Sequence, residues 1–348
     1  MSRKNTFTRA ALVAAMALTF QSVQAQDVHF TQFTASPLLV NPALTGAFSG
    51  QWRAAAIYRN QWRSVTIPFV TYGASFDAPV VTDLTHDDYL AAGVQLYNDR
   101  AGDGNLSNFS GLVSVAYHKF LGANVDKALT IGLQGGYTQK SIDLSKLYFG
   151  DEYYNGVFQQ GTSQEYPGLN NKVNYFTVNA GINWAHSTSD RFGYSIGVAA
   201  MNLNQPQESL QKKKNSEVGL GIRYSAQVGA IAFVSDKLSL RPAILYQTQS
   251  TANELVAGNE FNLIVGDDEF RNVATAVFLG GWIRSNDAMM ITGGLEWKGL
   301  RIGLSYDYNT SSLKNASNGN GGFEISLRYI APSPLDFARR LVYPCARF

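Results

Sequence analysis

The sequence predicts an all-β protein, a transmembrane antiparallel β-barrel of about fourteen strands, with twelve as the alternative count. Three observations support this fold class. Apolar and polar residues alternate with a period of two over long stretches. Charged residues make up only 16% of the chain, and the polar positions of the alternation are mostly small. Beyond residue 25, no stretch approaches the roughly 18 apolar residues that a membrane helix needs.

The alternation is clear over residues 172–186, and it recurs over 300–309 and 323–329. One face of the first stretch is apolar and the other is small and polar, as in Phe176, Val178, Ile182 and Trp184 against Thr177, Asn179, Gly181 and Asn183. A soluble sandwich also alternates, but its exposed face carries more Lys and Glu, so this pattern favours lipid on one side and a crowded lumen on the other. Tyrosines recur near strand ends, as in interfacial girdles: Tyr58, Tyr97, Tyr117, Tyr137, Tyr148, Tyr175, Tyr246 and Tyr329.

Residues 1–25 read as a signal peptide, with a basic start, an apolar centre and small residues before a cleavage site at Ala25. We therefore expect export to the outer membrane. Without Arg3, Lys4 and Arg9, the 28 basic residues fall to 25 against 26 acidic ones, a net charge of −1. This balance gives no reason to expect a nucleic-acid partner. Cys345 is the only cysteine, so no disulfide can form within the chain.

The candidate strands divide the mature chain into a barrel at 51–330, an N-terminal segment at 26–50 and a C-terminal tail at 331–348. The alternation is weakest at 70–77 and 253–265. Short and long connections alternate along the chain, as do the periplasmic turns and external loops of a bacterial barrel. With an even number of strands, both termini lie on the side of the short turns, in the periplasm. We expect the N-terminal segment to fold into the periplasmic mouth, against lumen residues such as Arg223, Arg301 and Glu324.

No residue pattern indicates catalysis, a metal site or a cofactor. His29, His86, His118 and His186 lack the spacing of metal ligands, and no serine is tied to a histidine and an acid by a local signature. A barrel hydrolase would need such a set, so we predict a protein that is not an enzyme.

Three other features call for an explanation. Arg59, Gln61, Trp62 and Arg63 surround the end of the first strand, as a lipid girdle or as a recognition surface for a partner. The longest connection, 141–171, is rich in aromatic residues that are typical anchors of protein interfaces: Tyr148, Phe149, Tyr153, Tyr154 and Phe158. The tail follows two prolines and is either a disordered end or a segment that docks through its apolar residues.

The chain resembles the PorP/SprF family of outer-membrane proteins of type IX secretion and gliding systems. The likeness spans the mature chain and rests on the order of several short motifs. They are Gln26-Asp27, Phe30-Thr31-Gln32-Phe33, the stretch Asn41-Pro42-Ala43-Leu44-Thr45-Gly46, the stretch from Tyr58 to Arg63, Gly303-Leu304-Ser305-Tyr306-Asp307, Gly321-Gly322-Phe323-Glu324-Ile325 and the ending Cys345-Ala346-Arg347-Phe348. The family tail usually reads Cys-Pro-x-Phe, whereas here Pro344 precedes the cysteine.

The resemblance implies a barrel that helps to export or anchor a secreted surface protein bearing a type IX C-terminal domain. It also implies contacts with the periplasmic ring and lipoprotein components of the secretion apparatus. On this reading, the long external loops bind the secreted partner, while the N-terminal segment and the tail bind the apparatus. The alternative is a passive channel, or a channel for hydrophobic solutes.

Overall fold

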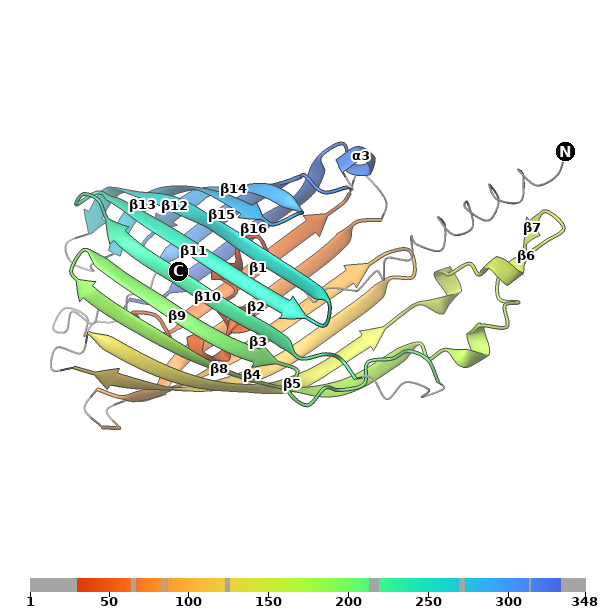
Figure 1. The fold of residues 1–348 in the computed structure, drawn as a ribbon, viewed down its shortest axis with the longest axis horizontal. Helices are drawn as coiled ribbons and strands as arrows, with labels where there is room; N and C mark the ends of the chain where they lie inside the picture. The colour runs from red at the N-terminus through yellow and green to blue at the C-terminus, as the bar shows by residue number, and fades with distance from the viewer. Residues whose placement is uncertain are drawn as a thin grey trace, which may run out of the picture.

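The computed structural model describes residues 30–332, apart from 64–66, 83, 86, 123–125, 213–218, 269–272 and 313. Fourteen strands form one closed antiparallel barrel in which the first strand, β1, pairs with the last, β16 (Figure 1). The barrel strands are β1 (Arg53–Gln61), β2 (Phe69–Val81), β3 (Tyr89–Ala101), β4 (Leu106–Leu121), β5 (Lys127–Ser141), β8 (Lys172–Ser189), β9 (Phe192–Met201), β10 (Arg223–Phe233), β11 (Leu238–Gln249), β12 (Ala252–Asp268), β13 (Val273–Arg284), β14 (Ala288–Trp297), β15 (Leu300–Asn309) and β16 (Asn320–Ile330).

The predicted fold class is confirmed, with fourteen strands rather than twelve. Both stretches of weak alternation lie in full barrel strands, because 70–77 is the centre of β2 and 253–265 falls within β12. Outward-facing side chains are large and apolar, as at Val113, Leu133 and Ile291, each more than half exposed. Inward-facing positions of the same strands carry buried polar residues such as Ser114 and Gln134. No helix in the described ranges is long and apolar enough to cross a membrane.

The two ends of the barrel differ in their connections. We call the end that carries the long connections after β5, β9 and β15 the loop end, and the opposite end, where the chain enters β1 and leaves β16, the turn end. The connections after β11 and β13 are the shortest at the loop end. Ser250 and Asn286 turn the chain there with φ values of 53° and 58°, the left-handed region in which asparagine is tolerated better than most residues.

The connection between β5 and β8 forms a small structured unit of its own. It contains three short 3₁₀ helices, η3 (Leu144–Lys146), η4 (Gly150–Glu152) and η5 (Tyr166–Gly168), and a hairpin of β6 (Tyr153–Tyr154) and β7 (Val157–Phe158). Figure 1 shows the hairpin far beyond the loop end of the barrel wall. A single helical turn, α3 (Lys314–Ser317), lies between β15 and β16.

One ladder hydrogen bond of the wall is missing at Pro242, in the middle of β11. The pairing of β10 with β11 passes from Gly229↔Ala243 directly to Ala232↔Leu240. Proline has no backbone N–H, so it cannot donate to the carbonyl of Ala230 opposite. The same strand remains fully paired with β12, so the defect is confined to one seam.

Candidate functional site in the barrel lumen

The described residues before β1 lie mostly inside the barrel. Residues 30–50, which we call the lumen segment, contain η1 (Phe33–Ala35), α2 (Pro37–Val40) and η2 (Pro42–Leu44). Most of its side chains are buried, and the red start of the ribbon in Figure 1 lies within the ring of strands. We expected 26–50 in the periplasmic mouth. The described part instead crosses the lumen, from the half of β16 nearer the loop end to the turn end, where it enters β1.

The first anchor of the lumen segment is the carboxylate of Glu324. It accepts the backbone N–H groups of Thr31 and Gln32, at 2.6 and 2.9 Å. The Thr31 hydroxyl donates to Asp307 at 2.7 Å. Consecutive backbone N–H groups form a favourable binding site for an anion. Here the anion is the carboxylate of Glu324, a residue of the barrel wall.

Two arginines neutralise these carboxylates. Arg59 donates to Glu324 and, at 2.9 Å, to Asp307. Arg284 lies 3.5 Å from Asp307, and both guanidinium groups also donate to the Thr31 hydroxyl. The four charged side chains are almost completely buried. Buried charges are tolerated when they are paired and hydrogen-bonded, so the cluster is stable only as a complete set.

The second anchor is Asn41, at the opposite wall. Its side-chain N–H groups donate to the carbonyls of Ile182 and Val198, at 3.1 and 3.3 Å, and so bridge β8 and β9. Its side-chain oxygen accepts the N–H of Ala43 at 2.8 Å and caps η2. Gly181 makes room for this contact, because a Cβ there would lie 2.0 Å from the Asn41 oxygen.

The third anchor is at Gly46, where the segment turns towards β1. The Gly46 N–H donates to Asp77 at 2.7 Å, and Arg53 forms an ion pair with the same carboxylate. Gly46 has a φ of 73°, and a Cβ there would lie 2.2 Å from that of Ala91, so only glycine fits without displacement. The neighbouring Thr45 carbonyl hydrogen-bonds the ring of His118 at 2.7 Å.

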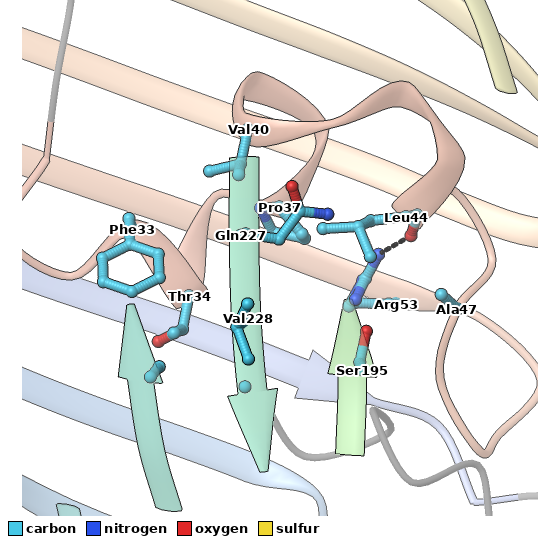
Figure 2. Close-up of a pocket in the computed structure, with 12 residues that line it drawn as sticks. Phe33, Thr34, Pro37, Val40, Leu44, Ala47, Arg53, Ser195, Gln227 and Val228 are labelled. Atoms are coloured by element: carbon cyan, nitrogen blue, oxygen red, sulfur yellow. Dashed lines mark hydrogen bonds between the residues drawn. The ribbon is translucent and has the colours of Figure 1, made fainter. Parts of the chain in front are cut away.

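Between its anchors, the lumen segment packs against an apolar patch of the wall. Phe33 meets Trp282 edge to face, with ring centroids 5.6 Å apart, and Val40 belongs to the same buried cluster. A small cavity remains beside this contact, between the segment and β9, β10 and β11 (Figure 2). The dashed line in Figure 2 marks the hydrogen bond from Arg53 to the Leu44 carbonyl at 2.9 Å.

The hairpin β6–β7 is a second candidate site, at the loop end. Four aromatic side chains of the hairpin and the chain just before it are more than half exposed, namely Tyr148, Tyr153, Tyr154 and Phe158. Phe149 instead packs edge to face on Tyr166, at 5.0 Å between ring centroids. The loop is held by carboxylates. Buried Glu152 accepts the N–H groups of Phe149 and Gly161 at 2.9 and 2.7 Å.

The chemistry available in these sites is hydrogen bonding and packing. Across the part of the chain that the structure describes, no group of three or more His, Cys, Asp or Glu side chains is placed to hold a metal ion. His118 lies between the Thr45 carbonyl and the hydroxyl of Thr130, which is an ordinary structural arrangement.

Residues 22–329 match the model of the type IX secretion system membrane protein PorP/SprF family. The chain belongs to this family. Comparison with curated proteins gave no match.

Among solved structures, the toluene transporter TbuX of Ralstonia pickettii is 10% identical, with 85% of this chain and 94% of that chain covered and a TM-score of 0.47. The CymD monoaromatic hydrocarbon channel is 9% identical, with 86% and 93% covered and a TM-score of 0.48. BamA from Haemophilus ducreyi is 7% identical, with 80% and 70% covered and a TM-score of 0.39. Nothing about function follows from likenesses this weak. The family and the barrel together place this PorP/SprF chain in the outer membrane.

Most PorP/SprF motif positions that the structure describes meet at the lumen segment. Asn41, Pro42 and Gly46 lie on the segment itself, and Asp307 and Glu324 form its first anchor. Tyr306 is different, since its side chain faces outwards and donates to Asn320 at 2.9 Å. Cys345 and Phe348 lie outside the described residues, as do the rest of the tail beyond Pro332 and the signal peptide.

The four residues that the sequence grouped around the end of β1 lie in different surroundings. Arg59 is only 2% exposed and lies in the lumen, so the expectation that it flanks Trp62 on an outer surface was wrong. Gln61 accepts a hydrogen bond from Arg59 at 3.3 Å. Trp62 packs edge to face on Phe69 at 5.0 Å, and Arg63 is exposed. Only Trp62 and Arg63 therefore remain available at the rim of the loop end.

Among the lumen residues named from the sequence, Glu324 and Arg223 hydrogen-bond the segment, whereas Arg301 pairs with Glu260 and Glu296. Sequence reasoning missed Thr31, Asp77 and Arg284 as anchors. The charges of Asp77 and Arg284 on the lumen-facing side of their strands were a usable signal. Thr31 was marked only as part of the motif Phe30-Thr31-Gln32-Phe33, which did not indicate its role.

Proposed function

We propose that this chain is a non-enzymatic outer-membrane barrel that binds a secreted surface protein of the type IX pathway and helps to export or anchor it. One observation carries the proposal. The β5–β8 connection presents Tyr148, Tyr153, Tyr154 and Phe158 to solvent beyond the barrel wall. Exposed aromatic clusters on a soluble face are typical anchors of protein interfaces.

The hairpin is held by contacts within its own loop. Tyr153 and Tyr154 pair with Phe158 and Val157, and the loop behind them is tied to Glu152 and Asp151. A surface that is already ordered loses less conformational entropy on binding. Together with the other loop-end connections, it supports an interface of ordinary size, roughly 1,600 Å².

The lumen segment disfavours the alternative, a passive or hydrophobic-solute channel. A channel needs a continuous path, whereas residues 30–50 cross the lumen and are fixed to β16 on one side and to β8 and β9 on the other. Releasing the first anchor would remove two backbone N–H groups from the buried carboxylate of Glu324, and the loss of hydrogen bonds to a buried charge is costly.

The partners divide between the two ends of the barrel. The secreted protein, with its type IX C-terminal domain, binds at the external loop end. The periplasmic ring and lipoprotein components bind at the turn end, next to residue 332, where the described chain stops. Outer-membrane lipid covers the apolar outer face between them.

Co-purification tests the proposal. The tagged protein is isolated in mild detergent from its own cells, and the bound proteins are identified by mass spectrometry. We expect a protein with a type IX C-terminal domain. Replacing both Tyr154→Ser and Phe158→Ser should reduce its recovery about thirtyfold, the effect of losing one interface hot spot.

The matched control is Gln159→Ser, which changes an exposed neighbour without removing an aromatic ring. It should leave recovery unchanged. If neither a secretion-domain protein nor an apparatus component co-purifies with the unmodified barrel, the proposal is wrong.

A further inference from the structure

The loop end of the barrel contains a cup above the lumen segment. The cup has a cavity volume of about 130 Å³ and is open to solvent at its mouth. Leu39 of the segment lies at its floor. Its walls include Tyr97 of β3, Asn108 of β4, Tyr175 of β8 and Asn202, which follows the end of β9. Tyr97 and Tyr175 thus face the lumen rather than the interfacial girdle expected from the sequence. A cavity of this size is smaller than a typical small-molecule site, so it can receive only part of a larger ligand.

The charges of the cup cancel. Lys140 pairs with Glu208 at 3.2 Å on its rim. Arg223 donates to the Leu39 carbonyl at 3.3 Å, and Asp99 accepts the Thr71 hydroxyl at 2.6 Å. The lining also includes apolar side chains, namely Leu106, Leu112, Met201 and Leu220. A suitable ligand is therefore neutral or balanced in charge, with apolar groups spaced along it.

Two buried amide atoms of the cup have unused hydrogen-bonding capacity. Among the described residues, none accepts from Nδ2 of Asn202 or donates to Oδ1 of Asn108. The Asn202 residue is only 6% exposed. Buried polar groups are nearly always satisfied in folded proteins. One free donor and one free acceptor call for a ligand that offers both.

The backbone at Asn202 is held in place by a chain of hydrogen bonds that ends on the lumen segment. The backbone N–H of Asn202 donates to Asn179 at 2.8 Å, and the Asn179 side chain donates to Gln134 at 2.7 Å. Gln134 donates in turn to the Leu38 carbonyl at 3.2 Å. With a φ of 59°, Asn202 occupies a conformation that asparagine tolerates and most residues do not.

We propose that the cup binds an extended polypeptide segment of the secreted partner, read by the amides of Asn108 and Asn202. This inference rests on the proposed function. A peptide backbone offers a donor and an acceptor at every residue, which matches the two amides. Its apolar side chains match the leucines and the methionine of the lining, which a glycan would leave without partners.

Photocrosslinking in intact cells tests the inference. The probe is p-benzoylphenylalanine in place of Leu106, with a second position at Leu220 and an outward-facing control at Val113. We expect covalent adducts with the secreted partner from both cup positions and none from the control. Mass spectrometry of the adduct identifies the peptide.

Asn202→Asp tests the amide directly. It keeps the shape and the unusual φ but replaces the donor with an acceptor, so the adduct from the Leu106 position should fall about tenfold, as for one lost hydrogen bond. Asn174→Asp adds the same charge on the exposed outer side of β8 and should change nothing.

The outcomes separate the inference from the proposed function. If the partner co-purifies but neither cup position reaches it, the cup is not its binding site while the function stands. An adduct with glycan, or an unchanged yield in Asn202→Asp, overturns the inference as well. If no partner co-purifies at all, both the proposed function and this inference are wrong.

Discussion

Glu324 connects the wall of the barrel to the chain inside it. Its carboxylate accepts two N–H groups of the lumen segment and the guanidinium of Arg59 on β1. Asp307 beside it accepts from Arg59 and the Thr31 hydroxyl, and it also pairs with Arg284. Each of these groups thus forms hydrogen bonds or ion pairs with several others. Removing one charge leaves the charges of its partners buried and uncompensated.

We predict that Glu324→Gln lowers the free energy of unfolding by about 3 kcal/mol, the usual cost of breaking a buried ion pair. The amide keeps the shape of the side chain but removes the charge opposite Arg59. The measurement is urea unfolding of the purified barrel in lipid vesicles or detergent.

The control for this variant is Glu165→Gln, which neutralises an exposed acid of the β5–β8 connection. It should unfold like the unmodified protein. Equal stability of both variants would show that the Glu324 charge is not needed to hold the lumen segment.

At the residue scale, the sequence indicated which residues form the anchors better than it indicated where each side chain lies. The family resemblance singled out Asn41, Gly46, Asp307 and Glu324, and all four anchor the lumen segment. Arg59 was misplaced because its neighbour Trp62 suggested a membrane rim. Its true partner is 265 positions away in sequence, across the seam between β1 and β16, and no local pattern reports such a register.

The β5–β8 connection is an element built around carboxylates rather than a hydrophobic core. Burial tends to raise the pKa of Glu152, but the N–H groups of Phe149 and Gly161 bind its ionised form and hold the pKa below its ordinary value. For Asp151, hydrogen bonds from Ser163 and Gln164 lower the pKa. The shape of the loop therefore depends on two ionised groups.

We predict that this loop loosens in acid. A carboxyl whose pKa is lowered by folding stabilises the fold above its unfolded pKa, and this contribution is lost as the pH falls through the folded value. The loop should therefore remain ordered at neutral pH and lose order once the pH falls below the ordinary range of Glu, about 4.3. A spin label on Val157→Cys, in a Cys345→Ser background, reports the mobility of the hairpin.

In Glu152→Gln, the label should be mobile already at neutral pH, with little further change in acid, because the neutral amide binds the two N–H groups more weakly. Glu165→Gln should keep the full pH dependence. A label that stays immobile in acid in the unmodified loop would contradict the role of Glu152.

Strands were the elements that the sequence predicted best. A barrel wall has lipid on one side throughout, so the alternation persists along each strand and is visible in one sequence. It weakened in β2, which includes Pro79, and in β12, where glycines and charged residues interrupt the pattern. The short helices of the lumen segment were not predictable, because contacts inside a lumen follow no period.

The whole molecule is a fixed ring that carries its own chain across the lumen. We predict that the intact protein conducts little in planar bilayers, whereas removal of residues 30–48 gives a large and steady conductance. A lumen of about fourteen strands is wide enough for water once nothing fills it.

Two controls keep this measurement clear. Removal of the hairpin residues 153–158 should leave conductance low, because it shortens a loop without touching the lumen. Both shortened proteins must migrate as folded barrels when unheated on denaturing gels. An intact protein that conducts as well as the shortened one would favour the channel alternative.

At this scale, the count of fourteen strands followed from the alternation and from the order of short and long connections. The path of the N-terminal segment did not, although its approach to Glu324 and Arg223 was foreseen. The difference is physical. A strand is specified by its own neighbours in sequence, whereas the lumen segment is specified by side chains brought together only when the ring has formed.

The location of the first anchor also links the lumen segment to the closure of the barrel. Arg59 and Glu324 are direct partners across the seam where β1 meets β16, the first and last strands of the barrel. Thr31 bridges this seam from the inside. Formation of this seam therefore brings the two groups that bind Thr31 to opposite sides of it. Closure of the ring and docking of the segment stabilise one another, so the segment acts as a clasp on the seam of the barrel.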